Sequence, residues 1–408
     1  MTDLRPTFGK RPLRRSAILE HLAAIRYRTG RRYPCVIMDG GFATEIERLG
    51  HDLSTTATQG EWAAAVLHKA PHDVQRVHRR YLEAGAEILT SASYQASMAS
   101  IPTAVEVLAR SLDRLDTQAS YVLRAVSLGP LAARLGGGLE YRGYADTEIF
   151  AAGDEAARET FRRYHEPRIA ACVPFFAENS NDRDLTGDGT VPRADFILFE
   201  TVPDALEATC ISELMTSDTR FENIPWAISL QCRLASSSPP LAPESSERCT
   251  NMPQLAGGGP VPSVVEELLV SSFGPDPESG TRNGPLFIGF NCCPPWLIRP
   301  ILESLQRCRH PLARQCAILS RTLERTEVRS ADKWANFAGW AVYPNSGEMW
   351  DPGTQTWGRP SASTLDPEND AFWQYHVPVW SALGATIIGG CCRIGPQGIS
   401  ALARVVLG

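Results

Sequence analysis

The sequence lacks the features that point to a membrane or a nucleic acid. No apolar run approaches the ~20 residues that a membrane-spanning helix requires. Basic residues are not in excess, because 40 lysines and arginines stand against 46 aspartates and glutamates, and the formal net charge is −6. Nucleic acids and anionic lipid surfaces both favour a basic patch, so we expect neither as a partner. A small molecule is the expected ligand.

Several enzyme signatures are also absent. There is no glycine-rich phosphate loop and no Cys-x-x-Cys pair, which argues against nucleotide-dependent and thioredoxin-like chemistry. The eight histidines form neither His-x-His nor His-Glu-x-x-His spacing, so a zinc hydrolase with histidine ligands is disfavoured.

The cysteines indicate free thiols rather than disulfides. Eleven cysteines are an odd number in a long chain, and the N-terminus shows no apolar segment typical of a signal peptide. We therefore expect a reducing compartment, the cytoplasm, in which thiols are available for metal binding or chemistry.

Residues 1–34 are predicted to form a basic N-terminal extension. They contain eight arginines and precede the first clear strand. A solvated arm and an added helix are both compatible with this composition. A mitochondrial presequence is a weaker alternative, because Asp3 and Glu20 add acidic charge to a segment type that is poor in it.

Residues 35–408 show a repeated alternation of short β-rich runs and longer stretches with helical spacing. Such alternation predicts parallel crossover units, and eight of them close a (β/α)8 TIM barrel. An eight-bladed propeller and a doubly wound sheet are the alternatives that periodicity leaves open. The eight predicted strands are Cys35–Met38, Glu87–Leu89, Val122–Val126, Phe196–Phe199, Trp226–Leu230, Leu286–Phe290, Gly339–Val342 and Ala385–Ile388.

The regular spacing fails at three places, which we interpret as loop insertions in one barrel domain. Residues 177–194 and 233–262 are rich in Ser, Pro, Gly and Asn, as flexible surface loops are. The third insertion is a longer helical stretch around 304–335. With 43% hydrophobic residues, the chain has enough apolar material for the large core that a single barrel needs.

Three thiols follow predicted strands at the end where barrel enzymes place their chemistry. Cys292 follows the sixth strand, and Cys391 and Cys392 follow the eighth after Gly389-Gly390. Consecutive side chains on a strand point to opposite faces, so the chain must turn before both can reach one metal, and the glycines give it that freedom. Three thiolates suit Zn²⁺ and leave one position open, as in catalytic sites.

Two other interpretations of these thiols stay open. Free cysteine often fills a core without any chemical role. Cys293 could also replace Cys292 as a ligand, or join it as the fourth ligand of a structural zinc in a non-enzymatic module.

Polar residues at other strand ends form a candidate substrate rim. Asp39 and Glu200 could hold a substrate ammonium, or could cap the helix that follows each of them. Gly40-Gly41 could offer backbone N–H groups to a carboxylate, or form a tight turn.

The segments that follow the strands, taken in order, resemble the homocysteine S-methyltransferase family over roughly 35–408. Seven of them carry the resemblance: Met38-Asp39-Gly40-Gly41, Ser91 to Ser97, Ser127-Leu128-Gly129-Pro130, Phe199-Glu200-Thr201-Val202-Pro203, Gly289-Phe290-Asn291-Cys292, Tyr343 to Glu348, and Gly389-Gly390-Cys391-Cys392-Arg393.

The resemblance implies a zinc-bearing barrel that moves a methyl group from a sulfonium donor to homocysteine and so forms methionine. It assigns the metal to Cys292, Cys391 and Cys392, and makes Cys293 a bystander. It assigns the amino-acid end of homocysteine to Asp39, Gly40 and Glu200, and the wall of the substrate cavity to Tyr94 and Gln95. The basic arm and the loop after Cys232 depart from the family pattern.

The resemblance also favours one class of methyl donor. The segment Ser93 to Ser97 looks like the branch that uses S-methylmethionine or S-adenosylmethionine. The alternatives are a methyltransferase of the same fold that uses betaine, or one that acts on another thiol or a selenol.

Overall fold

The computed structural model describes residues 15–28, 30–53, 61–112, 122–176, 194–235, 252–275, 283–319, 336–351, 356–358 and 366–408. Eight parallel strands form one sheet in the order β1-β12-β9-β8-β5-β4-β3-β2. A further parallel bridge joins Met38, directly after β1, to Ile88 of β2 and brings the two edges together as a barrel. The strands are β1 (Val36–Ile37), β2 (Ile88–Thr90), β3 (Leu123–Leu128), β4 (Phe196–Val202), β5 (Trp226–Leu230), β8 (Ile288–Asn291), β9 (Trp340–Tyr343) and β12 (Ala385–Ile388).

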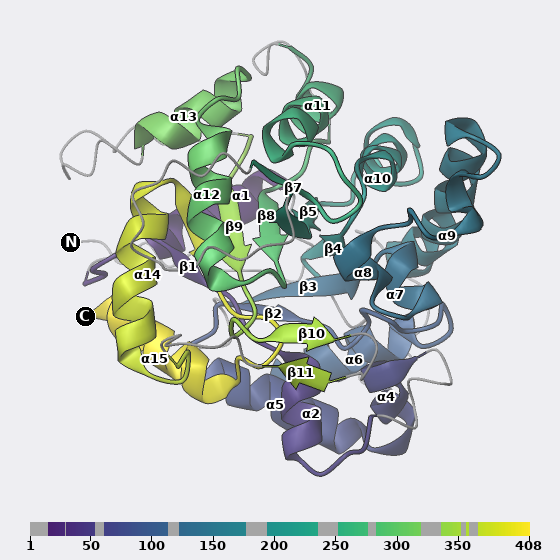
Figure 1. The fold of residues 1–408 in the computed structure, drawn as a ribbon. Coiled ribbons are helices and arrows are strands. Elements are labelled where there is room, and N and C mark those ends of the chain that lie inside the picture. Colours follow the sequence, from purple (N-terminus) through teal and green to yellow (C-terminus); the bar gives the residue numbers. More distant parts are fainter. Residues whose placement is uncertain are drawn as a thin grey trace.

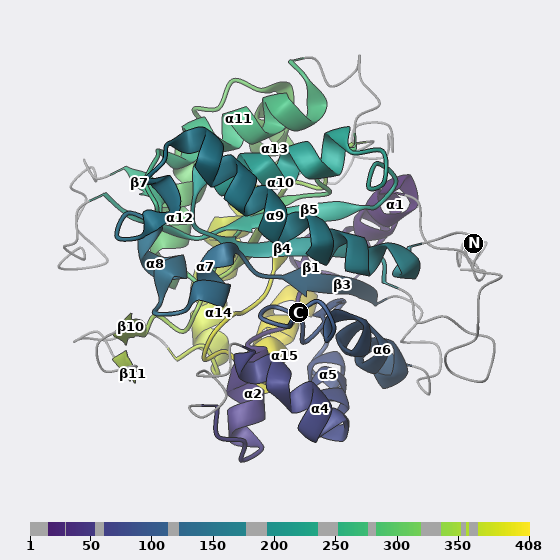
Figure 2. The same cartoon turned by 90° about the vertical axis from the view of Figure 1, so that its right-hand side faces the viewer.

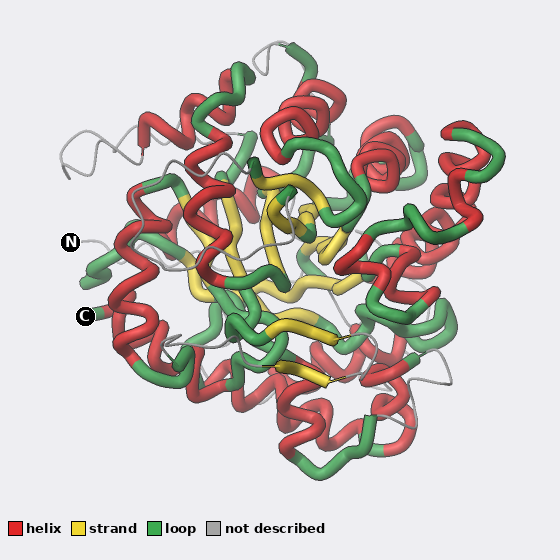
Figure 3. The backbone as a smooth tube through the Cα atoms, in the orientation of Figure 1, coloured by secondary structure: helices red, strands yellow, loops and turns green. Residues whose placement is uncertain are grey.

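Each of the eight predicted strands overlaps one of these, so the (β/α)8 barrel is confirmed. Helices surround the strands on the outside (Figure 3), and α9 and α10 lie side by side over the β4 face (Figure 2). The principal helices are α1 (Arg15–Arg26), α2 (Phe42–Arg48), α4 (Val66–Lys69), α5 (Pro71–Glu83), α6 (Ile101–Leu112), α7 (Leu131–Leu135), α8 (Leu139–Arg142), α9 (Asp154–Cys172), α10 (Ala205–Ser217), α11 (Val261–Phe273), α12 (Pro295–Leu305), α13 (Pro311–Leu319), α14 (Asp370–Ala382) and α15 (Pro396–Leu407). No helix in the described ranges is long and apolar enough to cross a membrane.

The strand residues divide into two buried sets. On β4, Ile197 and Phe199 face the helices, whereas Phe196 and Leu198 belong to the cluster inside the barrel. This alternation follows from the two-residue repeat of a strand and explains why the strands are apolar throughout.

Helix α1 closes the end of the barrel at which the strands begin. Its apolar residues Ile18, Leu22 and Ile25 pack into the interior cluster. The Nε atom of Arg15 donates to the Gly284 carbonyl oxygen at 2.9 Å, just before β8. Of the two forms considered for the basic extension, this part adopts the added helix (Figure 1). Residues 1–14 lie outside the described residues.

The predicted insertions contain more regular structure than a flexible loop. In 233–262, β6 (Cys232–Leu234) pairs antiparallel with β7 (Pro253–Leu255), and α11 already begins at Val261. The prediction of a loop was wrong there, because Leu234 and Leu255 are buried and hold the pair on the barrel. In 304–335, α12 ends at Leu305 and α13 follows. Residues 177–193, 236–251 and 320–335 lie outside the described residues.

One more antiparallel pair lies between β9 and β12 in the chain. It joins β10 (Met349–Asp351) to β11 (Thr356–Gly358). This pair was not predicted from the sequence.

Candidate metal centre

The three thiols at the ends of β8 and β12 meet at the mouth of the barrel. The sulfur atoms of Cys292, Cys391 and Cys392 all lie within 4.8 Å of one another. The Sγ atoms of Cys292 and Cys392 are 3.5 Å apart. Cys292 is buried, and the two others are partly exposed. Three sulfur donors at this spacing can hold a metal ion, with one position of a tetrahedral ion left for another ligand.

Strand β9, which lies between β8 and β12, and the residue after it hold the backbone of Cys292 and Cys391. The Cys292 N–H donates to the Tyr343 carbonyl oxygen at 3.2 Å, and the Cys391 N–H donates to that of Pro344 at 2.8 Å. Cys292 itself has a φ of 54°, an unusual left-handed conformation for a residue with a side chain. Its sulfur is therefore aimed by a backbone that its neighbours hold in place.

The glycine pair before Cys391 acts through close packing and not through the conformational freedom that we expected. Neither Gly389 nor Gly390 has a positive φ. A Cβ at Gly389 would lie 2.8 Å from the Cβ of Met38, and one at Gly390 would lie 2.5 Å from Cγ2 of Ile394. Any side chain at these positions would push the dicysteine turn away from β1.

Cys293 is separate from the thiol cluster. Its side chain is fully buried in the layer between strands and helices. Burial raises the pKa of this thiol well above its usual range. Within the described part of the chain the cluster has three members, and Cys293 is not a fourth. This arrangement disfavours the closed structural zinc site.

Hydrogen bonds within the cluster make the three thiols unequal. Those from Cys391 and Cys392 are the largest cause that holds the pKa of Cys292 below its usual range. Three sulfur atoms that contact one another in this way are close enough to bind one cation together.

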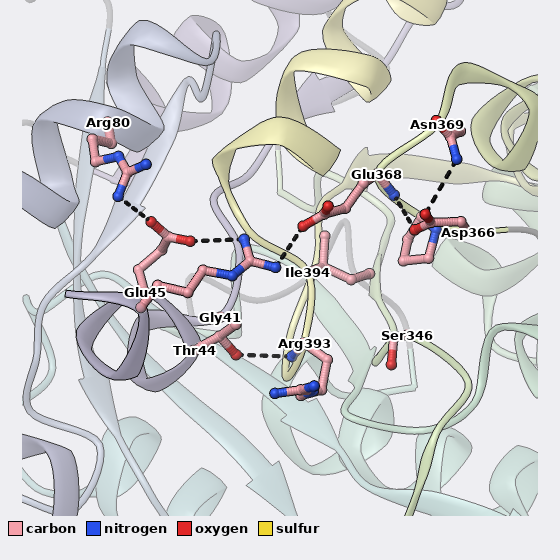
Figure 4. Close-up of polar contacts among 12 residues, drawn as sticks. Gly41, Thr44, Glu45, Arg80, Ser346, Asp366, Glu368, Asn369, Arg393 and Ile394 are labelled. Carbon is pink, nitrogen blue, oxygen red and sulfur yellow. Dashed lines mark hydrogen bonds and ion pairs between the residues drawn. The ribbon is translucent and has the colours of Figure 1, made fainter. Parts of the chain in front are cut away.

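The turn that follows the two cysteines is fastened to α2 (Figure 4). The Arg393 N–H donates to Oγ1 of Thr44 at 2.9 Å, and the Gly41 N–H donates to the Ile394 carbonyl oxygen at 2.8 Å. The Arg393 side chain donates to Oε2 of Glu348 at 2.9 Å. These contacts fix the thiols of β12 relative to both neighbouring loops.

A buried carboxylate on α2, that of Glu45, joins this helix to its surroundings through ion pairs. Glu45 is fully buried and pairs with Nη1 of Arg48 at 2.9 Å and with Nη1 of Arg80 at 2.7 Å. Arg48 also pairs with Glu368, so that the same network reaches the segment before α14 (Figure 4).

Asp39 is buried and Glu200 is partly buried, and neither residue caps a helix. Helix α2 begins after Gly41 without a side-chain cap. Strand β4 runs past Glu200 to Val202, and the cap of α10 is Asp204. The helix-cap alternative is therefore wrong for both residues.

Burial raises the pKa of both carboxyl groups. It is the largest cause for Asp39, with a pKa of about 8, and for Glu200, with a pKa of about 7. Oδ2 of Asp39 accepts hydrogen bonds from the Thr90 N–H at 2.7 Å and from its hydroxyl at 2.9 Å, and Ser127 donates to Glu200. In the described residues neither carboxyl group has an ion-pair partner, so a bound cation would find two acceptors here.

Gly40, Tyr94 and Gln95 have different surroundings. A Cβ at Gly40 would lie 2.4 Å from the Ile394 carbonyl oxygen, so only glycine fits. The charges of Glu140, Cys292 and Glu200 all act on the Tyr94 phenol, which places Tyr94 at the site. The Gln95 side chain donates to the Ala133 carbonyl oxygen at 2.7 Å and ties its loop to α7. The Gly41 N–H is already used by Ile394.

Sequence reasoning missed several residues of the site. Asn291 bridges β4, β5 and β8, because its Oδ1 accepts from the Ser229 hydroxyl at 2.8 Å and from the Thr201 N–H at 2.9 Å. From α8, Tyr141 contacts Sγ of Cys292, and the charge of Cys292 acts on Glu140. The available signal was position: α8 follows β3, and loops that follow strands line the mouth of a barrel.

Comparison with known proteins identifies a family and similar methyltransferases that match most of the chain. The family model described as homocysteine S-methyltransferase matches residues 36–406. Homocysteine S-methyltransferase 1 of Arabidopsis thaliana is 27% identical over 392 residues, which cover 91% of this chain and 93% of the relative. Selenocysteine Se-methyltransferase of Brassica oleracea var. italica is 28% identical over 393 residues and covers 90% of this chain and 88% of its own.

Solved structures agree on the fold. The metallated form of the homocysteine methyltransferase MmuM from Escherichia coli matches with a TM-score of 0.60 and 24% identity, over 94% of this chain and 99% of its own. The oxidized form of the same protein matches with a TM-score of 0.58 and 26% identity, over 91% of this chain and 95% of the MmuM chain.

Proposed function

The chain belongs to the homocysteine S-methyltransferase family, and on that basis we propose that it transfers a methyl group from a sulfonium donor to the thiol of L-homocysteine, which yields methionine. The observation that carries this proposal is the meeting of three thiols with two carboxyl groups, the buried Asp39 and the partly buried Glu200, at one barrel mouth. The thiols suit a metal that binds sulfur, and the carboxyl groups suit an amino acid.

We propose Zn²⁺ as the metal, with Cys292, Cys391 and Cys392 as its ligands. Three thiolates and an open fourth position match the preferences of this ion, and the metallated structural relative supports a metal in this fold. Bound zinc would supply the Lewis acidity that keeps the homocysteine thiol deprotonated at neutral pH. Because three thiolates give the site a net negative charge, the substrate sulfur would keep its nucleophilicity.

The remaining residues would bind and orient homocysteine. Asp39 and Glu200 would accept the ammonium group, the Gly40 N–H would face the carboxylate, and Tyr94 would line the cavity. The two carboxyl groups support this assignment, because burial without a cation is unfavourable to their charged forms. An ammonium between them would remove that penalty.

Transfer itself requires little beyond this alignment. The homocysteine sulfur, already without its proton, attacks the donor methyl carbon in line and forms the new C–S bond. The old C–S bond breaks, and its electron pair stays on the donor sulfur, which leaves as a neutral thioether. No general base is needed at that moment, so the protein contributes mainly by orientation.

The direct test is an assay of purified protein with homocysteine and S-methylmethionine, S-adenosylmethionine or betaine at equal concentration. We expect methionine from at least one sulfonium. A kcat/KM for betaine above those of both sulfoniums would overturn the donor assignment. The absence of methionine with every donor would overturn the function.

A selenol is the second candidate acceptor. The observation that favours it is the similarity to selenocysteine Se-methyltransferase, which equals that to the homocysteine enzymes. The same assay with selenocysteine decides which acceptor is preferred. A kcat/KM for selenocysteine above that for homocysteine would make the selenol the preferred acceptor.

We also propose that the protein acts in a reducing compartment such as the cytoplasm. The three proposed metal ligands must be thiolates, and oxidation of any pair would remove two of them. Fractionation of cells that express the full chain tests this location.

Glu200→Gln is expected to weaken homocysteine binding. The amide keeps the shape of the side chain but removes a charge that would face the ammonium, so the KM for homocysteine should rise about tenfold or more. Metal content should not change. Glu303→Gln, on the exposed surface of α12, is the matched control. If Glu200→Gln has the homocysteine KM of wild type, Glu200 does not bind the ammonium.

The affinity for methionine is expected to depend on pH. The raised pKa values of Asp39, about 8, and Glu200, about 7, leave these groups increasingly protonated as the pH falls through this range. An ammonium prefers the ionised forms, so affinity should rise from about pH 6 to about pH 8, by at most tenfold per unit for each proton released. Calorimetric titration with methionine at each pH measures this affinity. Methionine is suitable because it has no thiol whose own deprotonation would change with pH. A profile in Glu200→Gln as steep as in wild type would contradict the explanation.

A further inference from the structure

The short helix α8 contacts the thiol cluster from the loop after β3. The Tyr141 hydroxyl lies 3.1 Å from Sγ of Cys292, within hydrogen-bond distance. The residue before it, Glu140, has its Oε2 atom buried and without a hydrogen-bond partner. Native proteins rarely leave a buried carboxylate oxygen unpaired, so Glu140 needs an explanation.

The C-terminal end of α8 is fixed by the two residues that follow it. Gly143, with a φ of 75°, packs so closely that a Cβ there would lie 2.2 Å from Cα of Gly257. The next residue, Tyr144, donates from its hydroxyl to Oε2 of Glu207 at 2.6 Å and accepts from the Ala132 N–H at 2.8 Å. The turn that carries Glu140 is therefore held against the barrel.

The carboxyl group of Glu140 has no cation of its own. Burial is the main cause that raises its pKa to about 7, and the charge of Cys292 adds to it. The charge of Arg142, two residues away, lowers this pKa, but the Arg142 side chain makes its contacts elsewhere: it donates to the Gly137 carbonyl oxygen at 3.1 Å and pairs with Asp146 at 3.5 Å. In the described residues no ion pair joins Glu140 to a basic side chain.

We propose that Glu140 recognises the positively charged sulfonium of the methyl donor. This inference rests on the proposed function. During transfer the methyl carbon is shared by two sulfur atoms, so the sulfonium must come next to the homocysteine sulfur. That sulfur in turn would lie beside Cys292, the thiol that Tyr141 contacts. A carboxylate on the same turn is in the right place to face the donor cation.

The neighbouring charges separate this role from binding of the homocysteine ammonium. Asp39 and Glu200 act on one another electrostatically. The charges that act on Glu140 are those of Cys292 and Arg142, and neither Asp39 nor Glu200 is among them. Cys292 also acts on Glu200, so Glu140 and Glu200 approach the same thiol without acting on one another.

The Tyr94 ring completes the surroundings of a cation. Glu140 exerts the largest effect of any charge on its phenol, so the ring and the carboxyl group lie close together. A carboxylate attracts a cation by its charge, and an aromatic face attracts it by the quadrupole of its ring. Because transfer discharges the sulfonium, this attraction is stronger in the substrate complex than in the transition state, and its loss should appear mainly in KM.

The test compares the metal-loaded wild-type protein with Glu140→Gln. We expect the KM for the sulfonium donor to rise about tenfold, with the KM for homocysteine and the metal content unchanged. The inhibition constant of the neutral thioether that the donor leaves behind, measured in competition with the donor, should stay the same. Because Oε2 accepts no hydrogen bond, the isosteric amide should not alter the thermal midpoint.

Two control variants show whether the charge of Glu140 causes the change in donor KM. Glu140→Asp retains the charge and should keep most of the donor affinity, and Glu159→Gln, exposed on α9, should match wild type. An unchanged donor KM in Glu140→Gln overturns the inference, and so does an equal loss for sulfonium and thioether, which would assign Glu140 to the donor ammonium. A wild-type protein that transfers no methyl group to homocysteine would instead reject the proposed function.

Discussion

Replacing Cys391 with serine is expected to remove both the bound metal and the methyl transfer. A serine hydroxyl stays protonated at neutral pH and is a poor ligand for an ion that prefers thiolate. Loss of a group that merely hydrogen-bonds a metal ligand costs ~10–100-fold in affinity, so loss of the ligand itself should exceed about 100-fold. Metal content by mass spectrometry of the purified variant and its rate with homocysteine measure the two effects together.

Cys293→Ser is the matched control for this experiment. It makes the same chemical change one residue from Cys292, at a thiol that faces the layer between strands and helices. We expect it to keep its metal and its activity. Full metal occupancy in Cys391→Ser, or loss of metal in Cys293→Ser without unfolding, would contradict the assignment of ligands.

Replacing Glu207 with alanine is expected to produce the largest loss of stability. Oε1 of Glu207 lies 2.8 Å from Nε2 of His165 and accepts from the Leu131 N–H at 2.7 Å, while Oε2 accepts from Tyr144. All of these groups are buried, and removing the carboxylate takes a hydrogen-bond partner from each of them. The breaking of such a network lowers the free energy of unfolding by about 3–5 kcal/mol.

Urea denaturation of the metal-loaded protein measures this loss. Glu213→Ala is the matched control, because Glu213 lies on the same helix, α10, but is exposed and pairs with Arg158 and Arg162 on the surface. Such pairs contribute about 0–1 kcal/mol. If the two variants unfold at the same urea concentration, the buried network does not hold the β3 loop and α8 in place.

The sequence predicts the barrel because the spacing of apolar residues differs between the predicted strands and helices, and because small residues separate these elements. It also predicts the convergence of the thiols, because the ends of parallel strands share one face. It does not predict how far each strand runs. Glu200 was expected just after a strand, yet β4 continues to Val202, since Val202 pairs with Leu230 of β5 past a local shift in register. Pairing of this kind depends on a partner strand, which local composition does not reveal.

Helix α8 was beyond sequence reasoning for a different reason. It has four residues, Leu-Glu-Tyr-Arg, too few for a hydrophobic period to be recognised. Its position depends on Gly143 meeting Gly257, more than a hundred residues later, and on the buried bonds of Tyr144. Contacts between distant segments decide that Glu140 and Tyr141 face the thiols, and a single sequence carries no record of such contacts.

The fastening of the dicysteine turn to α2 has a consequence for how the protein folds. The hydrogen bond from Arg393 to Thr44 spans 349 residues, so it forms only when the first and last strands of the barrel have met. Contacts between such distant residues are slow to form, because a long loop must close first. The metal-binding geometry should therefore appear only in the last and slowest kinetic phase. During refolding, the time course of metal uptake would then report barrel closure. It would lag behind the recovery of helical circular dichroism.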